Sequence, residues 1–170
     1  MKAKNYFSGG LLICGAAISF QAGSATSASA EVQITVTSPR PTCNLTVQSK
    51  YDLGALPPGE FAHPAFPVRI DCTGSIRTVL TARNTTGTLQ TDNYRVAIPI
   101  NGSANSWGPF MWLKNKGGRN IKLTGAESDK FCDLSVKNRV CDVTPVTNVR
   151  EGAAYGKGSV SIHFSIIYPA

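Results

Sequence analysis

The residues of this chain with the widest chemical scope are its five cysteines, whose thiols can form disulfides, hold metal ions or act as nucleophiles. Cys14 stands near the start, and Cys43, Cys72, Cys132 and Cys141 follow. The four cysteines that follow the expected export signal of residues 1–30 indicate two disulfides. Of the three pairings, proximity in sequence favours Cys43–Cys72 and Cys132–Cys141. Neither pair has the C-x-x-C spacing of a zinc site, so we expect no metal centre.

Histidine and carboxylate side chains, the usual acid–base groups, show no arrangement that predicts catalysis. His163 falls on the polar side of an alternating segment and His63 lies in a segment expected to be a loop, so we expect both to be solvated. Asp129, Asp133 and Asp142 flank the later cysteines and could form a weak calcium site, but polar loop positions are the better explanation. The hydrolase, metalloprotease, phosphate-loop and dinucleotide motifs are missing from the sequence. We therefore expect no enzyme activity and no cofactor.

One dense aromatic cluster remains, formed by Trp107, Phe110, Met111 and Trp112. Tryptophan is a frequent anchor in binding surfaces and its ring stacks well on sugars. Trp107, Phe110 and Trp112 are therefore a candidate receptor loop for a glycan or a protein. The same residue types also fill the core of ordinary β-sandwiches, and that alternative stays open.

The segments that must position these residues follow an expected export signal over residues 1–30. Lys2 and Lys4 precede a short, mostly apolar stretch, and Ala28-Ser29-Ala30 has the small residues of a cleavage site. The apolar stretch is too short to span a bilayer stably. We therefore expect an exported protein.

The remaining chain has the length of one domain with a core of its own, which we place at residues 39–170. Without the two lysines of the leader, 15 basic residues face 10 acidic ones. The excess is modest and scattered, with no run of Lys or Arg. This pattern predicts a solvated surface and no nucleic-acid partner.

The hydrophobic pattern predicts an all-β fold. Cys43, Leu45 and Val47 alternate with polar residues, and so do the residues from Phe66 to Cys72. Both cysteines then face the interior, where a bridge between them would tie two strands together. Further strands are expected at 77–83, 94–100, 107–113 and 119–123, a loop at 125–130, and a hairpin at 132–143 closed by its own disulfide. Short strands with a core disulfide suggest an immunoglobulin-like sandwich.

The two ends of the expected mature chain carry the clearest strand patterns. At the C-terminal end one face of the segment gathers five apolar side chains, which are Val160, Ile162, Phe164, Ile166 and Tyr168. At the other end Val32, Ile34 and Val36 alternate with polar residues over an arm of residues 31–38. An apolar sheet edge left open is prone to association. We expect a neighbouring subunit to cover this closing strand.

These features together resemble the pilin subunits of chaperone–usher fimbriae. The resemblance rests on four features. The first is Cys43 followed by Asp52-Leu53-Gly54 and the Phe66–Cys72 segment, and the second is the alternating closing strand with Tyr168 near its end. The third is Gly156, about a dozen residues before Tyr168, and the fourth is the alternating arm after the leader. It covers the expected mature chain loosely and is strongest at its two ends. No single motif is specific, whereas their combination is.

The resemblance implies an incomplete immunoglobulin-like sandwich that lacks its seventh strand. A periplasmic fimbrial chaperone would supply a strand during secretion, and an outer-membrane usher would direct assembly. In the fimbrium, the arm of another subunit would replace the chaperone strand. Val32, Ile34 and Val36 would be the inserted side chains, and the apolar face from Val160 to Tyr168 would line the acceptor. The protein would reach the bacterial cell surface and contribute to adhesion without being an enzyme.

The sequence departs from the family pattern in three places. Pro169-Ala170 follows the tyrosine, the arm lacks a glycine and is short, and the Cys132/Cys141 pair is additional. A minor, adaptor or tip subunit is therefore an alternative to the shaft subunit, and a tip-located adhesin could bind a host glycan or protein through the aromatic cluster. Alternatively, Val32, Ile34 and Val36 are the first strand of a closed sandwich.

Overall fold

The computed structural model describes residues 32–103 and 106–169, which fall into two units divided after Thr37. In the first unit, residues 32–37 contain no helix and no strand. The side chains of Val32, Ile34 and Val36 are 80%, 81% and 81% exposed. The predicted signal peptide and Cys14 lie outside the described residues.

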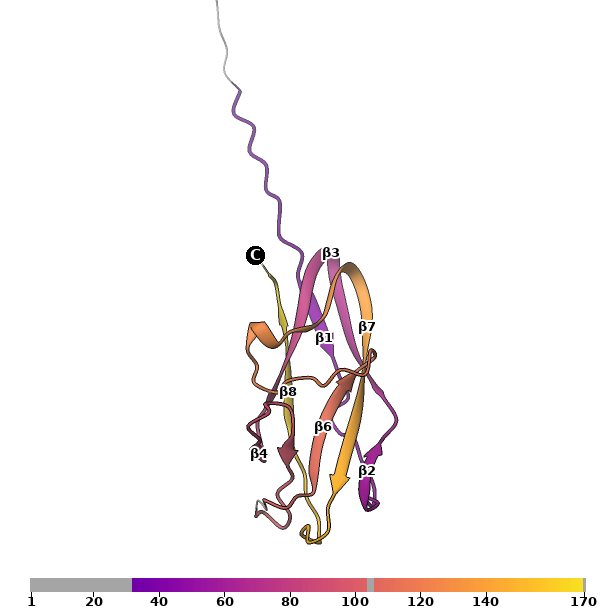
Figure 1. Cartoon of the computed structure of the whole chain (residues 1–170). Helices are drawn as coiled ribbons and strands as arrows, with labels where there is room; N and C mark the ends of the chain where they lie inside the picture. The colour runs from indigo at the N-terminus through magenta and orange to yellow at the C-terminus, as the bar shows by residue number, and fades with distance from the viewer. Residues whose placement is uncertain (1–31, 104–105, 170) are drawn as a thin grey trace, which may run out of the picture. The chain divides into compact units, whose positions relative to one another are not determined.

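The second unit is built from β-strands, as the alternating pattern predicts (Figure 1). Its one helical turn in the described part of the chain is the 3-10 helix η1, Glu127–Asp129. The strands in chain order are β1 Cys43–Thr46, β2 Gly59–Ala62, β3 Phe66–Asn84, β4 Thr88–Leu89, β5 Val96–Ala97, β6 Phe110–Asn115, β7 Phe131–Val149 and β8 Ile162–Ile167. Over residues 32–103 and 106–169, no helix has the length and apolar character needed to cross a membrane.

The long strands β3 and β7 pair twice, and this double pairing makes the sandwich. Phe66 to Asp71 pair antiparallel with Val143 to Asn138, the register then shifts, and Ile76 to Leu80 pair with Val136 to Phe131. Both strands bend between these stretches at one end of the domain (Figure 1). Each strand therefore contributes first to one layer and then to the other, as in sandwiches whose corners are made by strands that change sheet.

The two layers differ in size. The first has the order β1, early β3, late β7, β6, β5 and β4, with β2 pairing along late β7. The second contains β8 on the later part of β3, where Val79 to Asn84 pair with Ile167 to Ile162. All pairings are antiparallel. The all-β, immunoglobulin-like prediction is confirmed.

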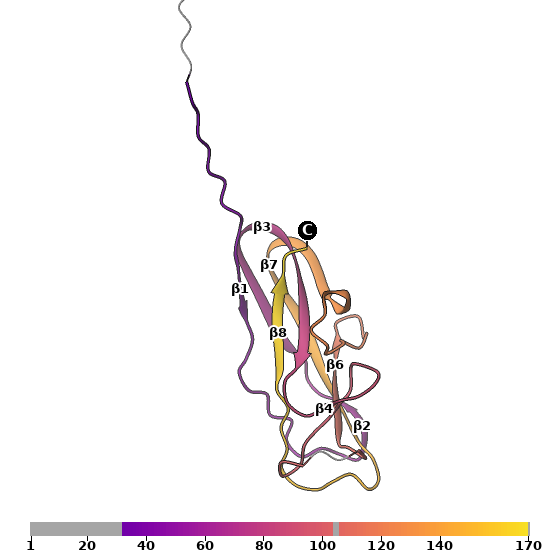
Figure 2. The same ribbon diagram turned by 90° about the vertical axis from the view of Figure 1, so that its left-hand side faces the viewer.

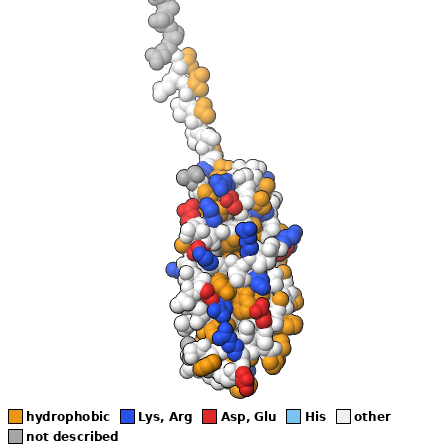
Figure 3. Space-filling model, in the orientation of Figure 1, with side chains coloured by type: hydrophobic (Ala, Val, Ile, Leu, Met, Phe, Trp, Pro, Cys, Tyr) orange, Lys and Arg blue, Asp and Glu red, His pale blue; other side chains and the backbone are white. Residues whose placement is uncertain are grey.

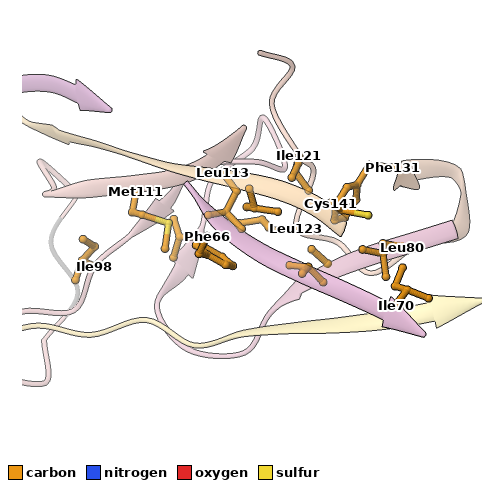
Figure 4. Packing of buried hydrophobic residues seen from close by; sticks show 14 of the residues in the cluster. Phe66, Ile70, Leu80, Ile98, Met111, Leu113, Ile121, Leu123, Phe131 and Cys141 are labelled. Atoms are coloured by element: carbon orange, nitrogen blue, oxygen red, sulfur yellow. The ribbon is translucent and has the colours of Figure 1, made fainter. Parts of the chain in front are cut away.

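The core lies between the layers (Figure 4). Alternate residues of early β3 point inward, and Val68 and Ile70 are 0% exposed. Leu80 of later β3, Leu113 of β6 and Val143 of β7 meet them in one cluster. Burial of an aliphatic side chain contributes roughly 1.5–3 kcal/mol, so this cluster is the main source of stability.

Both predicted disulfides are present. Cys43 and Cys72 are directly opposite each other in the β1–β3 ladder and are bonded. Cys72 is buried and Cys43 packs against the core, as their alternation predicts. The second disulfide joins Cys132 and Cys141, both within β7.

Three predictions on strands need correction. Residues 132–143 are not a hairpin, because β7 pairs with β3 on both sides of its bend. Residues 119–123 form no strand, because this segment leaves β6 and crosses to β3: Ile121 N donates to Leu113 O, and Asn84 N donates to Leu123 O. The expected strand at 94–100 shortens to Val96–Ala97. The exposed strand β2 has no alternating burial and was not predicted.

Candidate functional site

The candidate site is a margin of the sandwich where both sheets end in an unpaired strand. β1 is the edge of the first sheet and β8 of the second, and in both sheets β3 lies between that edge strand and β7. β1 and β8 therefore flank the same margin (Figure 2). Within the described part of the chain, no strand pairs with the second edge of either one. We call this margin the open margin.

The apolar side chains at the open margin pack on the core but are not covered by it. The predicted acceptor residues Val160, Ile162, Phe164 and Ile166 are all half-buried, and they contact the buried cluster. Leu45 and Val47, which alternate inward on the β1 side, are half-buried in the same way. The core is therefore only partly covered along this margin.

Aromatic contacts fix Phe164 at the centre of the margin. Its ring lies 6.3 Å from that of Phe66 and 6.4 Å from that of Phe131, centroid to centroid, in edge-to-face arrangements. Such pairs add about 0.5–1.5 kcal/mol beyond the area that they bury. Phe164 thus links β8 to early β3 and to the start of β7.

Tyr168 closes one end of the open margin. Its hydroxyl accepts a hydrogen bond from Cys43 N at 2.9 Å, which joins the end of β8 to the start of β1. The guanidinium of Arg40 lies 5.2 Å from the centre of the tyrosine ring. Tyr168 therefore has a bridging position, whereas the other four predicted acceptor residues pack on the core cluster.

Glycines allow close packing at the other end of the margin. Asn101 N donates to Lys157 O at 2.8 Å, and Gly158 bridges to Ile100. A Cβ at Gly158 would lie 2.6 Å from Pro99 O, and one at Gly156, where φ is +139°, would lie 2.6 Å from Asn101 Nδ2. The segment that leads into β8 can lie this close only without side chains.

The three residues of the predicted receptor loop have different environments. Phe110 and Trp112 are 3% and 5% exposed, whereas Trp107 is 63% exposed. Arg150 lies over the ring of Phe110 at 5.0 Å, and Tyr94 contacts Trp112 edge-on at 6.4 Å. Two of the three rings are therefore packed inside the protein.

Two of the three acidic residues near the second disulfide, Asp129 and Asp133, have basic partners. Asp133 pairs with Arg77, whose hydrogen bonds lower the pKa of the carboxyl, and Asp129 pairs with Lys122. Among the described residues, no three His, Cys, Asp or Glu side chains lie close enough together to hold a metal ion. Basic side chains on the face in Figure 3 are spread out with acidic ones among them.

His163 is exposed, as predicted, but the prediction for His63 is wrong. His63 follows β2, and its side chain is buried with Nε2 2.8 Å from Thr147 Oγ1. Its ring also packs edge-on against Phe61 at 5.2 Å. The bend between β2 and β3 turns this residue inward, and its N donates to Pro145 O. Burial lowers the pKa of His63 below its ordinary value of 6.5.

We expect the stability of the domain to fall as the pH drops below about 6.5. The folded state holds His63 neutral, because desolvation lowers its pKa. The unfolded state therefore binds more protons in this range, so the free energy of unfolding rises with pH through it. The measurement is urea unfolding between pH 5 and pH 8. His63→Gln should flatten this dependence, and the exposed His163→Gln should leave it unchanged; the reverse result would contradict the assignment.

Comparisons with known proteins bear on the fold. No family model matches the sequence, and no curated protein matches it. The structure matches a chain from a solved structure described as a chaperone–usher pilus that reveals the molecular basis of rod uncoiling. The TM-score is 0.54 at 13% sequence identity, and the match covers 84% of this chain and 96% of the other. The chain therefore shares its fold with a chain of a chaperone–usher pilus.

Proposed function

We propose that this protein is a non-enzymatic fimbrial subunit that polymerises by donor-strand exchange. The observation that carries the proposal is the open margin: two unpaired edges, β1 and β8, flank a row of half-buried apolar side chains. The shared fold with a chain of a chaperone–usher pilus supports it. In this proposal the missing seventh strand of the sandwich comes from another polypeptide.

An inserted strand would satisfy two needs of the open margin at once. Its backbone would pair with the free N–H and C=O groups of β1 and β8, and its alternate side chains would cover Leu45, Phe164 and their neighbours. Peptides that add to a sheet edge gain affinity from main-chain hydrogen bonds and specificity from such alternate side chains. The same physics protects the edge from uncontrolled association.

The arm of a second copy has the chemistry of the missing strand. Val32, Ile34 and Val36 stand at every second position and are largely exposed. If fully buried in the open margin of a neighbour, each would contribute roughly 1.5–3 kcal/mol. The polar residues between them would face solvent, as the outer face of a sandwich strand requires.

The proposal implies a route and a set of partners. A periplasmic fimbrial chaperone would cover the open margin first, an outer-membrane usher would pass the subunit outward, and other pilin subunits would then supply or receive the arm. The protein would end in a fimbrium on the bacterial cell surface. We do not propose a tip adhesin that binds through Trp107, Phe110 and Trp112, because two of these rings are buried.

Thermal unfolding of two oxidised forms of the protein, residues 31–170 and 39–170, tests the proposal. We expect the shorter form to aggregate or melt early, and a peptide of residues 31–38 to raise its melting temperature, because the peptide fills the open margin. A peptide with Ile34→Asp should have no effect. If the shorter form is a stable monomer whose melting ignores the peptide, the sandwich is closed and donor-strand exchange is wrong.

A further inference from the structure

A polar hollow of about 310 Å³ lies on the outer face of the second sheet, away from the core. Three neighbouring segments line it. Thr81 and Arg83 come from the later part of β3, His163 and Ser165 from β8, and Thr124 and Gly125 from the segment on the other side of β3. We propose that this hollow is a binding site for a small oxyanion, such as the carboxylate or sulfate group of an acidic sugar.

The pairing of the strands brings these side chains together. Thr81 is directly opposite Ser165, and Arg83 is opposite both His163 on one side and Thr124 on the other. Residues two apart on a strand share a face, so the six residues form one patch across three adjacent segments. This patch depends on tertiary pairing, because Arg83 and Ser165 are 82 residues apart in the sequence.

The charge of the hollow favours an anion. Arg83 is exposed and forms no ion pair with any described residue, and none of the lining residues is acidic. The acidic group next to the lining is Asp129, which accepts a hydrogen bond from Thr124 Oγ1 at 2.5 Å and pairs with Lys122 Nζ at 3.2 Å. These bonds lower the pKa of Asp129 and occupy both carboxylate oxygens. The planar guanidinium of Arg83 is left to pair with a ligand carboxylate or sulfate.

Two hydroxyl groups in the hollow are available for a ligand. Thr81 is 3% exposed, and it lines the hollow. Ser165 is directly opposite Thr81 and lines the same hollow. A hydroxyl donates one bond and accepts others, so the pair suits an anion that carries further hydroxyls.

Gly125 keeps the hollow open beside Arg83. Its φ is +78°, and a Cβ there would lie 3.1 Å from the Cβ of Arg83 and 3.2 Å from its Cδ. Gly125 N also donates to Ala82 O at 2.9 Å, which fixes the backbone against β3. The arginine stem therefore lies along a bare backbone and the hollow keeps one rigid wall.

The hollow and the open margin are on different sides of β8. His163 and Ser165 face outward, whereas Ile162, Phe164 and Ile166 pack on the core. A strand that pairs with the edge of β8 would leave its outer face uncovered. The oxyanion site would thus remain accessible in an assembled fibre, and its test does not depend on assembly.

Saturation-transfer NMR, which works for assemblies of any size, tests this site with a matched pair of sugars. Glucuronate and glucose differ only in the carboxylate, and sodium sulfate serves as a competitor. We expect a signal from glucuronate, none from glucose, and displacement of glucuronate by sulfate. Equal signals from both sugars, or none from glucuronate, would overturn the proposal, as would a glucuronate signal that sulfate leaves unchanged.

Variants locate the binding. Arg83→Gln should weaken glucuronate binding about tenfold or more, because it removes a charge-assisted hydrogen bond. Thr81→Val keeps the shape of the side chain and should also weaken binding. Arg119→Gln removes an exposed charge outside the hollow and should bind normally. Unchanged melting temperatures would exclude misfolding as the cause, and an Arg119→Gln loss equal to that of Arg83→Gln would overturn the site.

Discussion

Ile34→Asp in the full chain should abolish fibre formation, whereas Thr35→Asp, one residue further on, should permit it. Ile34 is the central apolar residue of the arm, and Thr35 belongs to its polar alternation. The proposed insertion places Ile34 against the half-buried side chains of the open margin. Replacing it removes its burial energy and forces a carboxylate towards an apolar surface, for a loss of roughly 3–5 kcal/mol.

Such a loss weakens the contact between subunits at least about a hundredfold. Negative-stain electron microscopy and resistance to dissociation in detergent would measure it, with intracellular levels of both variants compared. The two substitutions add the same charge to neighbouring positions, so they differ only in the face of the arm that they alter. Equal effects of the two variants would contradict donor-strand exchange.

The largest expected effect on stability comes from the disulfide between Cys43 and Cys72. Replacing both cysteines by alanine should cost roughly 3–4 kcal/mol, because the bond closes a loop with a sequence separation of 29. It also ties β1 to β3 at the open margin, where β1 has no other strand partner among the described residues. We therefore expect β1 to detach first in the double variant.

The second disulfide provides the matched control. Cys132 and Cys141 have a sequence separation of only 9, for which the same entropy relation gives about 2.5 kcal/mol. Thermal unfolding followed by circular dichroism should therefore rank the Cys43/Cys72 double variant below the Cys132/Cys141 one. The opposite order would show that the Cys132–Cys141 bond stabilises the bend in β7 more than the Cys43–Cys72 bond stabilises the edge strand β1.

Local sequence patterns predicted the strands that have one apolar face and one polar face. Early β3 alternates regularly between apolar and polar residues, and β8 does so up to Ile166, so the alternation alone predicts which of these side chains face inward. The cysteine spacing indicated the disulfide pairing for a related reason: Cys43 and Cys72 each continue the inward face of an alternating strand. These predictions required only the period of a β-strand and the cost of exposing apolar surface.

Segments whose environment is set by distant partners were not predictable in this way. His63 stands next to Pro64 in the sequence, which indicated a solvated loop, and only the bend between β2 and β3 buries it against Thr147. Residues 132–143 were expected to pair with themselves, but β3 offers a longer ladder on both sides of the bend. In each case the deciding contact comes from far along the chain.

The candidate site was likewise predicted only in part from the sequence. The sequence by itself determined the apolar faces of the arm and of β8, because alternation is a local property of the chain. Only the tertiary structure decided that β1 and β8 flank one margin with no strand between them in the described chain, because strand order follows from how β3 and β7 bend. It likewise decided that Arg83, His163 and Ser165 meet in one hollow, because cross-strand register joins residues that the sequence keeps far apart.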